Sequence, residues 1–242
     1  MNIFFNILIS VSAATVAALI GVYGARFFNY KIRKYEIYLI SLAAGLLLAN
    51  AFLHLLPEAI KLTSFWPYCL LIAIIIFYLL EQTVMIHSCR EEHCENHAIG
   101  LMSLAGLTFH SLVDGLAIGV SFEAGFGIGL VSSAAIIFHK IAEGGCTYSL
   151  LICDDKLKNR AMLFSWLVAL ATPIGALLAY GFLRQAPASS LGILLALAAG
   201  SFIYISASDL LPATHRKSSW INILWLLLGV VFVFLINNLI SN

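Results

Sequence analysis

The chain has 242 residues, of which 62% are apolar and only 10% are charged. A soluble domain of this composition would expose a large apolar surface to water, so the composition predicts an integral membrane protein. The formal net charge is +1 and no basic stripe with interleaved aromatic residues occurs, so we expect no nucleic-acid partner. The five cysteines are scattered and predict free thiols, not a disulfide framework.

Eight long apolar segments account for almost the whole chain. A helix needs about 20 mostly apolar residues to cross the hydrocarbon core of a bilayer, and each segment is long enough. We therefore predict an all-α membrane protein in which eight transmembrane helices form one domain, residues 1–242. The predicted helices are 3–25, 36–57, 66–88, 98–121, 127–152, 161–183, 189–211 and 219–240.

Basic residues are distributed unevenly between the two sides of this predicted bundle. The loops after the first, third, fifth and seventh helices contain ten of the thirteen Lys and Arg residues. Loops rich in Lys and Arg stay in the cytoplasm during insertion. Both termini are therefore expected on the extracytoplasmic side.

One of these cytoplasmic loops, 87–97, is rich in side chains that bind metals. It contains His87, His93 and His97, together with two cysteines and three glutamates. Such a composition is typical of a segment that captures metal transiently, and a solvated acidic loop would have much the same composition. The spacing does not match that of a closed zinc finger. Both interpretations stay open.

The second and seventh predicted helices share a pattern at a constant offset. Leu-Ala-Ala-Gly begins at Leu42 and again at Leu197, and a polar residue precedes Leu-Leu-Pro in both, namely His54 and Asp209. An even-numbered and an odd-numbered helix run in opposite directions through the membrane. We therefore predict an inverted repeat, helices 1–3 and 6–8, around a central pair formed by helices 4 and 5.

That central pair contains a second repeated pattern. His110 and Asp114 on one helix, and His139 and Glu143 on the next, are each four residues apart and each followed by glycine. Residues at this spacing share one face of a helix, so two antiparallel helices joined by the glycine-rich turn near Gly125 offer four ligands. Imidazole and carboxylate ligands suit zinc, and also ferrous iron and manganese.

The energetic cost of these residues favours a functional site. An ionisable group at the centre of a bilayer costs at least about 2.5 kcal/mol, and with Lys140 five lie close together. The structural alternative is a polar network in which Asp114 pairs with Lys140 and His110 pairs with Glu143. Because the same spacing occurs twice, we favour the metal site.

The chain resembles the ZIP family of zinc and iron transporters, and the resemblance covers essentially its whole length. The motifs that carry it are HSLVDG, HKIAEG, AFLHLLPEA and SDLLPATH. The resemblance implies an eight-helix fold, extracytoplasmic termini, and metal uptake toward the cytosol by alternating access. By motif position it also implies His110, Asp114, His139 and Glu143 as the ligands of the transported metal.

Two positions depart from family members that have a two-metal centre. The residue after each histidine is often Asn and an acid in those members, whereas Ser111 and Lys140 stand here. An ammonium beside Glu143 repels a second cation and takes its place electrostatically. We therefore predict one transported metal per site, with the simple pairing of Lys140 to a carboxylate as the alternative.

Three further residues are candidates along the path of the metal. His54 and Glu58 are four apart at the outer end of the second helix, where they would collect metal. In the alternative interpretation, Pro57 ends the helix and Glu58 is simply solvated. Asp209 occupies the related place on the seventh helix and would face the cytoplasmic exit.

The function that these observations favour is transport of a divalent transition metal, zinc first, and not an enzymatic reaction. The expected partners are the metal ion and the lipid bilayer, with a homodimer as a further candidate. An intramembrane zinc hydrolase is the main alternative. No HExxH signature occurs, and no separate general base stands beside the four ligands. A metal-sensing or scaffolding membrane protein is the third interpretation.

Overall fold

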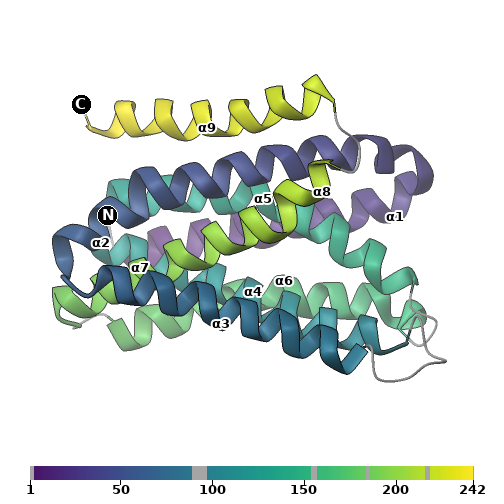
Figure 1. Ribbon diagram of the computed structural model, residues 1–242, viewed down its shortest axis with the longest axis horizontal. Helices are drawn as coiled ribbons and strands as arrows, with labels where there is room; N and C mark the ends of the chain where they lie inside the picture. The colour runs from purple at the N-terminus through teal and green to yellow at the C-terminus, as the bar shows by residue number, and fades with distance from the viewer. Residues whose placement is uncertain (1–2, 89–96, 154–156, 184–185, 216–218, 242) are drawn as a thin grey trace.

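The computed structural model describes residues 3–88, 97–153, 157–183, 186–215 and 219–241, and all elements in this part of the chain are helical. Figure 1 shows a bundle of long helices that run roughly side by side. The α-helices are α1 (Ile3–Asn50), α2 (Leu56–Leu62), α3 (Trp66–Ser88), α4 (His97–Ala124), α5 (Phe126–Cys153), α6 (Ala161–Leu183), α7 (Ala188–Ile205), α8 (Leu211–His215) and α9 (Trp220–Ser241). Short π-helical segments η1 (Ala51–Leu55) and η3 (Ser206–Leu210) and a 3₁₀ turn η2 (Lys158–Arg160) complete the fold.

The helices are long and apolar enough for a membrane protein. Six helical stretches among the described residues have the length and hydropathy to cross a bilayer. The elements α3 and α9 are 23 and 22 residues long and add apolar stretches at Trp66–Gln82 and Trp220–Ile236. At about 1.5 Å per residue, each of these two helices also reaches across about 30 Å of hydrocarbon. The predicted all-α membrane fold is confirmed.

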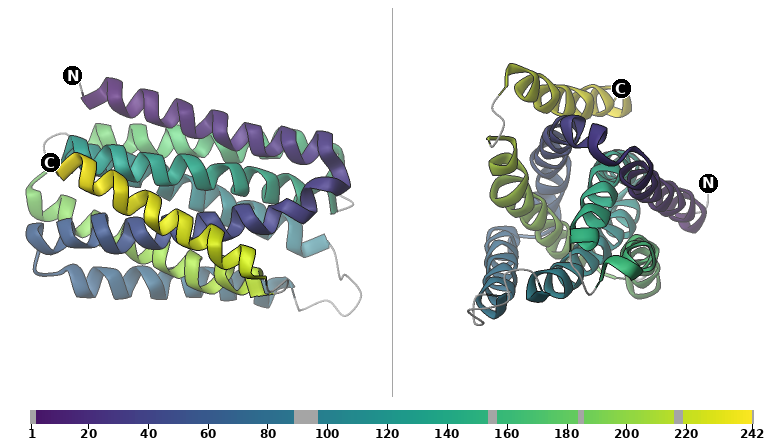
Figure 2. Two further views of the ribbon diagram at one scale, coloured as in Figure 1. Left: turned by 90° about the horizontal axis from the view of Figure 1, so that it is seen from above. Right: turned by 90° about the vertical axis from the view of Figure 1, so that its right-hand side faces the viewer.

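The first element, α1, contains two of the predicted helices. The sequence predicts a loop between residues 25 and 36, whereas the backbone is helical throughout. Figure 2 shows that the chain reverses direction within α1, so that the apolar stretches Ile3–Phe27 and Ile37–Leu62, the second of which continues through η1 and α2, lie antiparallel. The prediction of a loop was wrong because Lys and Arg, although unfavourable in lipid, are good helix formers. The start of α1 and the end of α9 lie at the same end of the bundle in Figure 1 and in the left view of Figure 2.

The second apolar part of α1 does not end at Pro57, contrary to one interpretation of the sequence. The helix α2 continues to Leu62, and Pro57 lies in its first turn, where the missing N–H needs no partner. The preceding segment η1 is a π-helix, whose wider turn makes room for the proline ring. The segments η3 and α8 stand in the same relation to Pro212, and in Figure 1 α2 and α8 lie toward opposite ends of the bundle. The inverted repeat stays a prediction, and this correspondence supports it.

Side chains segregate by size between the surface and the interior of the bundle. Large apolar side chains such as Phe182, Leu224 and Leu163 are exposed, as expected of a surface that faces lipid. Most of the buried apolar residues are alanines, and serines are common among the buried polar ones. Small residues allow membrane helices to approach closely, because lipid provides no hydrophobic force between them.

One close approach of two backbones joins α1 to α5. A Cβ atom added at Gly144 would lie 2.0 Å from the backbone oxygen of Ala18, and one added at Gly21 would lie 2.0 Å from the backbone oxygen of Ile141. The two backbones are therefore in direct contact, and neither position has room for a side chain.

The same kind of contact joins α4 to α6. A Cβ atom added at Gly115 would lie 1.9 Å from the backbone oxygen of Thr172, and one at Gly175 would lie 2.0 Å from that of Leu112. Gly115 and Gly144 each follow the carboxylate of a predicted ligand pair. The glycine of each motif therefore fixes the helix with the predicted ligands against a neighbour, α6 for α4 and α1 for α5.

Candidate metal centre

The four predicted ligands lie on the adjacent helices α4 and α5. Gly125 alone separates the two helices, so the turn between them is short and they pack antiparallel. Each helix has 28 residues, and His110 and His139 lie at the middle of their respective helices. The two motifs therefore meet at one depth in the bundle, as the sequence predicts.

The structure brings one atom of each predicted ligand to within 4.8 Å of the others. Nε2 of His139 lies 3.4 Å from Oδ2 of Asp114 and 3.3 Å from Oε2 of Glu143. Nε2 of His110 lies 3.5 Å and 3.6 Å from the same two oxygens. Ligands at about 2.1 Å from a tetrahedral zinc ion are about 3.4 Å apart. These four nitrogen–oxygen distances therefore suit a single tetrahedral ion.

Lys140 and Ser111 complete a buried polar network around Glu143. Nζ of Lys140 lies 2.8 Å from Oδ2 of Asp114 and 2.6 Å from Oε2 of Glu143, and it donates to Oγ of Ser111 at 2.7 Å. Ser111 in turn donates to the other oxygen of Glu143, Oε1, at 2.5 Å. The sequence suggests a pairing of Lys140 with one carboxylate, whereas the ammonium contacts both.

The charges at this centre are almost completely withdrawn from solvent. The side chain of Lys140 is 0% exposed, and none of the four predicted ligands is more than 11% exposed. With both carboxylates ionised and Lys140 protonated, the centre has one negative charge in excess. A buried charge without a counter-ion is costly, so such a centre favours the binding of a cation.

The polar network that the sequence offers as the alternative to a metal site also forms. The contacts of Asp114 with Lys140 and of His110 with Glu143 are both present. That network leaves Nδ1 of both histidines and Oδ1 of Asp114 buried without a hydrogen-bond partner among the described residues. It therefore does not satisfy the polar atoms of the centre.

His54 and Glu58 are not part of the group of potential metal ligands on α4 and α5, and their role as an entry pair stays a prediction. The imidazole of His54 is buried and hydrogen-bonds to the backbone of Val233 on α9. Glu58 forms an ion pair with Lys61, with 2.9 Å between Oε2 and Nζ. Among the described residues, the only group of three or more potential metal ligands is the one on α4 and α5.

Several predicted residues lie where the structure describes little. His87 belongs to α3 and His97 belongs to α4. Residues 89–96, including His93, fall outside the described part of the chain. Asp209 lies in η3, and its side chain is not described. The roles suggested for these residues stay predictions.

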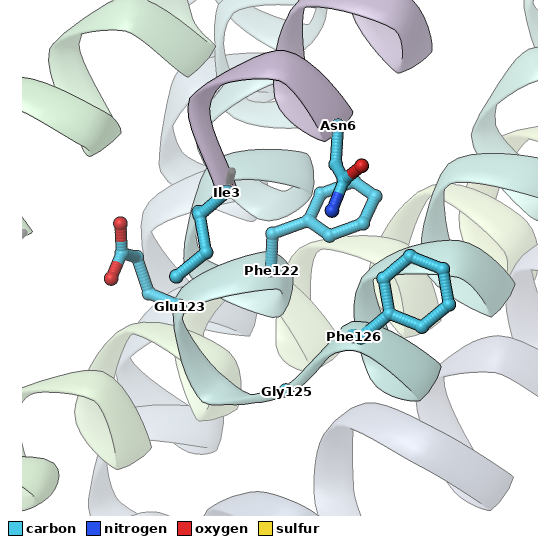
Figure 3. A pocket seen from close by; sticks show the side chains of 6 residues that line it. All are labelled: Ile3, Asn6, Phe122, Glu123, Gly125 and Phe126. Carbon is cyan, nitrogen blue, oxygen red and sulfur yellow. The ribbon is translucent and has the colours of Figure 1, made fainter. Parts of the chain in front are cut away.

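Two features of the structure, a hydrogen bond and a cavity, were not predicted from the sequence. Glu81 on α3 accepts a hydrogen bond from the hydroxyl of Tyr204 on α7, and the signal for it was a carboxylate within an apolar helix. A cavity of about 470 Å³ lies where the start of α1 meets the turn between α4 and α5 (Figure 3). No residue of the metal centre lines the cavity, which is bounded by Ile3, Asn6, Phe122, Glu123, Gly125 and Phe126.

Residues 86–237, more than half of the chain, match the ZIP zinc transporter family, and this stretch includes the whole centre on α4 and α5. The chain belongs to the ZIP family. The resemblance noted in the sequence is therefore confirmed. Members of this family are transporters and not enzymes, so membership disfavours the intramembrane hydrolase.

Relatives in mammals, plants and bacteria are similar to this ZIP chain. It is 33% identical over 150 residues to zinc transporter SLC39A7 of Canis lupus familiaris, covering 58% of this chain and 32% of the relative. It is 29% identical over 221 residues to zinc transporter 3 of Arabidopsis thaliana, covering 72% and 64%. It is 37% identical over 121 residues to zinc transporter ZupT of Chlorobium luteolum, covering 50% and 46%. The chain thus spans about a third of the length of the mammalian relatives that it matches.

The comparisons do not test the oligomeric state, so the homodimer stays a prediction.

Proposed function

We propose that this ZIP chain moves a divalent transition metal, zinc first, into the cytosol by alternating access through the centre on α4 and α5. The observation that supports this most directly is the convergence of His110, Asp114, His139 and Glu143 within 4.8 Å. Two imidazoles and two carboxylates are ligands that zinc prefers, and their spacing suits a tetrahedral ion. The relatives named as zinc transporters support the choice of zinc.

Flux measured with purified protein in proteoliposomes tests this proposal. We expect external zinc to enter vesicles that contain the chain and not vesicles without protein. Adding iron, manganese or cadmium in competition would rank the metals at the same time. Tight binding of zinc without any flux would exclude transport and favour a metal-sensing protein.

We further propose that the centre binds one transported ion and not two. The ammonium of Lys140 lies between Asp114 and Glu143, where it repels a second cation. Zinc counted per chain after equilibrium dialysis should therefore be one in the unmodified protein. Counting would be repeated with His139→Ala, which should lose the bound ion. Two ions per unmodified chain, both lost in that variant, would contradict the proposal.

The proposed orientation places both termini outside the cytoplasm, which follows from the basic loops. Lys61 and Lys158 then lie on opposite sides of the membrane, and both are described on short connections between long helices. With the native cysteines replaced, Lys61→Cys should react with a membrane-impermeant thiol reagent added to intact cells, whereas Lys158→Cys should react only after permeabilisation. The reverse pattern of labelling would invert the orientation.

A further inference from the structure

We propose that the Lys140 ammonium is a tethered competitor of the transported metal, which the metal must displace from Asp114 and Glu143 while Ser111 retains it. This inference rests on the proposed function and concerns the regulation of the same site. It explains how the negative charge of the site is reduced between two transport events.

The ammonium and the metal need the same two atoms. Nζ of Lys140 contacts Oδ2 of Asp114 and Oε2 of Glu143, and these are the oxygens that face Nε2 of both histidines. A zinc ion bound to either oxygen at about 2.1 Å would lie within about 5 Å of Nζ. Two cations at that distance repel each other strongly in a buried site. The ammonium must therefore withdraw from the two carboxylates as the metal binds.

Ser111 is the remaining partner of the withdrawn ammonium. Its Oγ accepts from Nζ at 2.7 Å and donates to Oε1 of Glu143, the oxygen that does not face the histidines. This chain of hydrogen bonds does not use Oδ2 of Asp114 or Oε2 of Glu143. It therefore leaves both oxygens to the metal while the ammonium keeps one neutral acceptor.

Exchange between these two states has a consequence for the transport cycle. When Lys140 contacts both carboxylates, the centre without metal carries one excess negative charge. The two carboxylates without the ammonium would carry two. A lower buried charge makes it easier for the centre to pass between its two orientations without metal. The ammonium also lowers the affinity for zinc, because displacing it costs two charge-assisted contacts. Lys140 thus acts as a positioning residue that favours release of the metal and return of the transporter without it.

The test compares Lys140→Met, which has a side chain of similar size without charge, with Ser111→Ala. Zinc affinity would be measured by calorimetry on each protein, after thermal stability has shown that it is folded. We expect Lys140→Met to bind zinc at least tenfold more tightly. Ser111→Ala should bind zinc several-fold more weakly, because the displaced ammonium loses its remaining acceptor. A merely structural role for the network would weaken binding in both variants and would overturn the inference.

Transport kinetics give a second readout that does not depend on affinity alone. In Lys140→Met proteoliposomes, net uptake into vesicles without zinc should fall at least tenfold, whereas exchange of labelled external zinc for internal zinc should be retained. Exchange does not require the transporter to return without metal. An equal fall in net uptake and in exchange would overturn the inference. If zinc binding is also indifferent to His139→Ala, the proposed function itself fails, and the two failures are thereby distinguished.

Discussion

Replacing His139 with Ala should lower zinc uptake into proteoliposomes by at least about 100-fold. Loss of a residue that only supports a metal ligand typically costs 10- to 100-fold in metal affinity, so loss of a ligand costs at least as much. His139 is buried, and its Nε2 lies within 3.4 Å of both carboxylates. A tetrahedral ion would retain three protein ligands. Initial rates of uptake at several zinc concentrations would measure the loss.

Leu130→Ala is the matched control for this prediction. Leu130 lies on the same helix, α5, and its side chain is 42% exposed on the surface that faces lipid. Its truncation should leave uptake within about twofold of the unmodified protein, because exposed positions away from special features have small effects. Uptake retained in His139→Ala, with protein of normal stability, would remove His139 from the ligand set.

Replacing Gly144 with Ala should destabilise the protein by about 1–3 kcal/mol or more, the range found for overpacked sites. The added Cβ atom would lie 2.0 Å from the backbone oxygen of Ala18 and 2.8 Å from its carbonyl carbon. A flexible side chain could move aside, but a helix backbone cannot do so without a shift of α1 relative to α5. The thermal stability of detergent-solubilised protein, followed by size-exclusion chromatography, would measure this effect.

Gly106→Ala separates this steric effect from the effect of adding a methyl group to any transmembrane glycine. Gly106 lies on α4, and nothing lies within 4 Å of a Cβ atom added there. Alanine has the higher helix propensity, so this variant should be as stable as the unmodified protein or slightly more stable. Equal stability of the two alanine variants would show that α1 and α5 can separate at little cost.

The convergence of the metal centre could be predicted because it depends on local geometry. A spacing of four residues places His110 above Asp114 on any α-helix, and the short turn at Gly125 brings the second pair opposite the first. The number of long helices followed from apolar length alone. Neither prediction required knowledge of how distant helices pack.

Features that depend on packing between distant segments could not be predicted in the same way. The contact of Lys140 with two carboxylates depends on the separation of α4 and α5, which no spacing within a single helix determines. The π-helical segment that contains His54 has no signal in the sequence that distinguishes it from an α-helix. The helical reversal after Phe27 was missed because a run of charged residues predicts exposure to water and not the backbone conformation.

Gly21 and Gly144 lie at one crossing of α1 and α5. A side chain at either glycine would force the same two backbones apart. Once one substitution has separated the two helices at this crossing, the second substitution causes a smaller additional loss of stability. The energetic effects of the two substitutions are therefore coupled, and their sum exceeds the effect of the double substitution. In thermodynamic terms the two glycines are a single determinant of stability that is encoded more than a hundred residues apart in the chain.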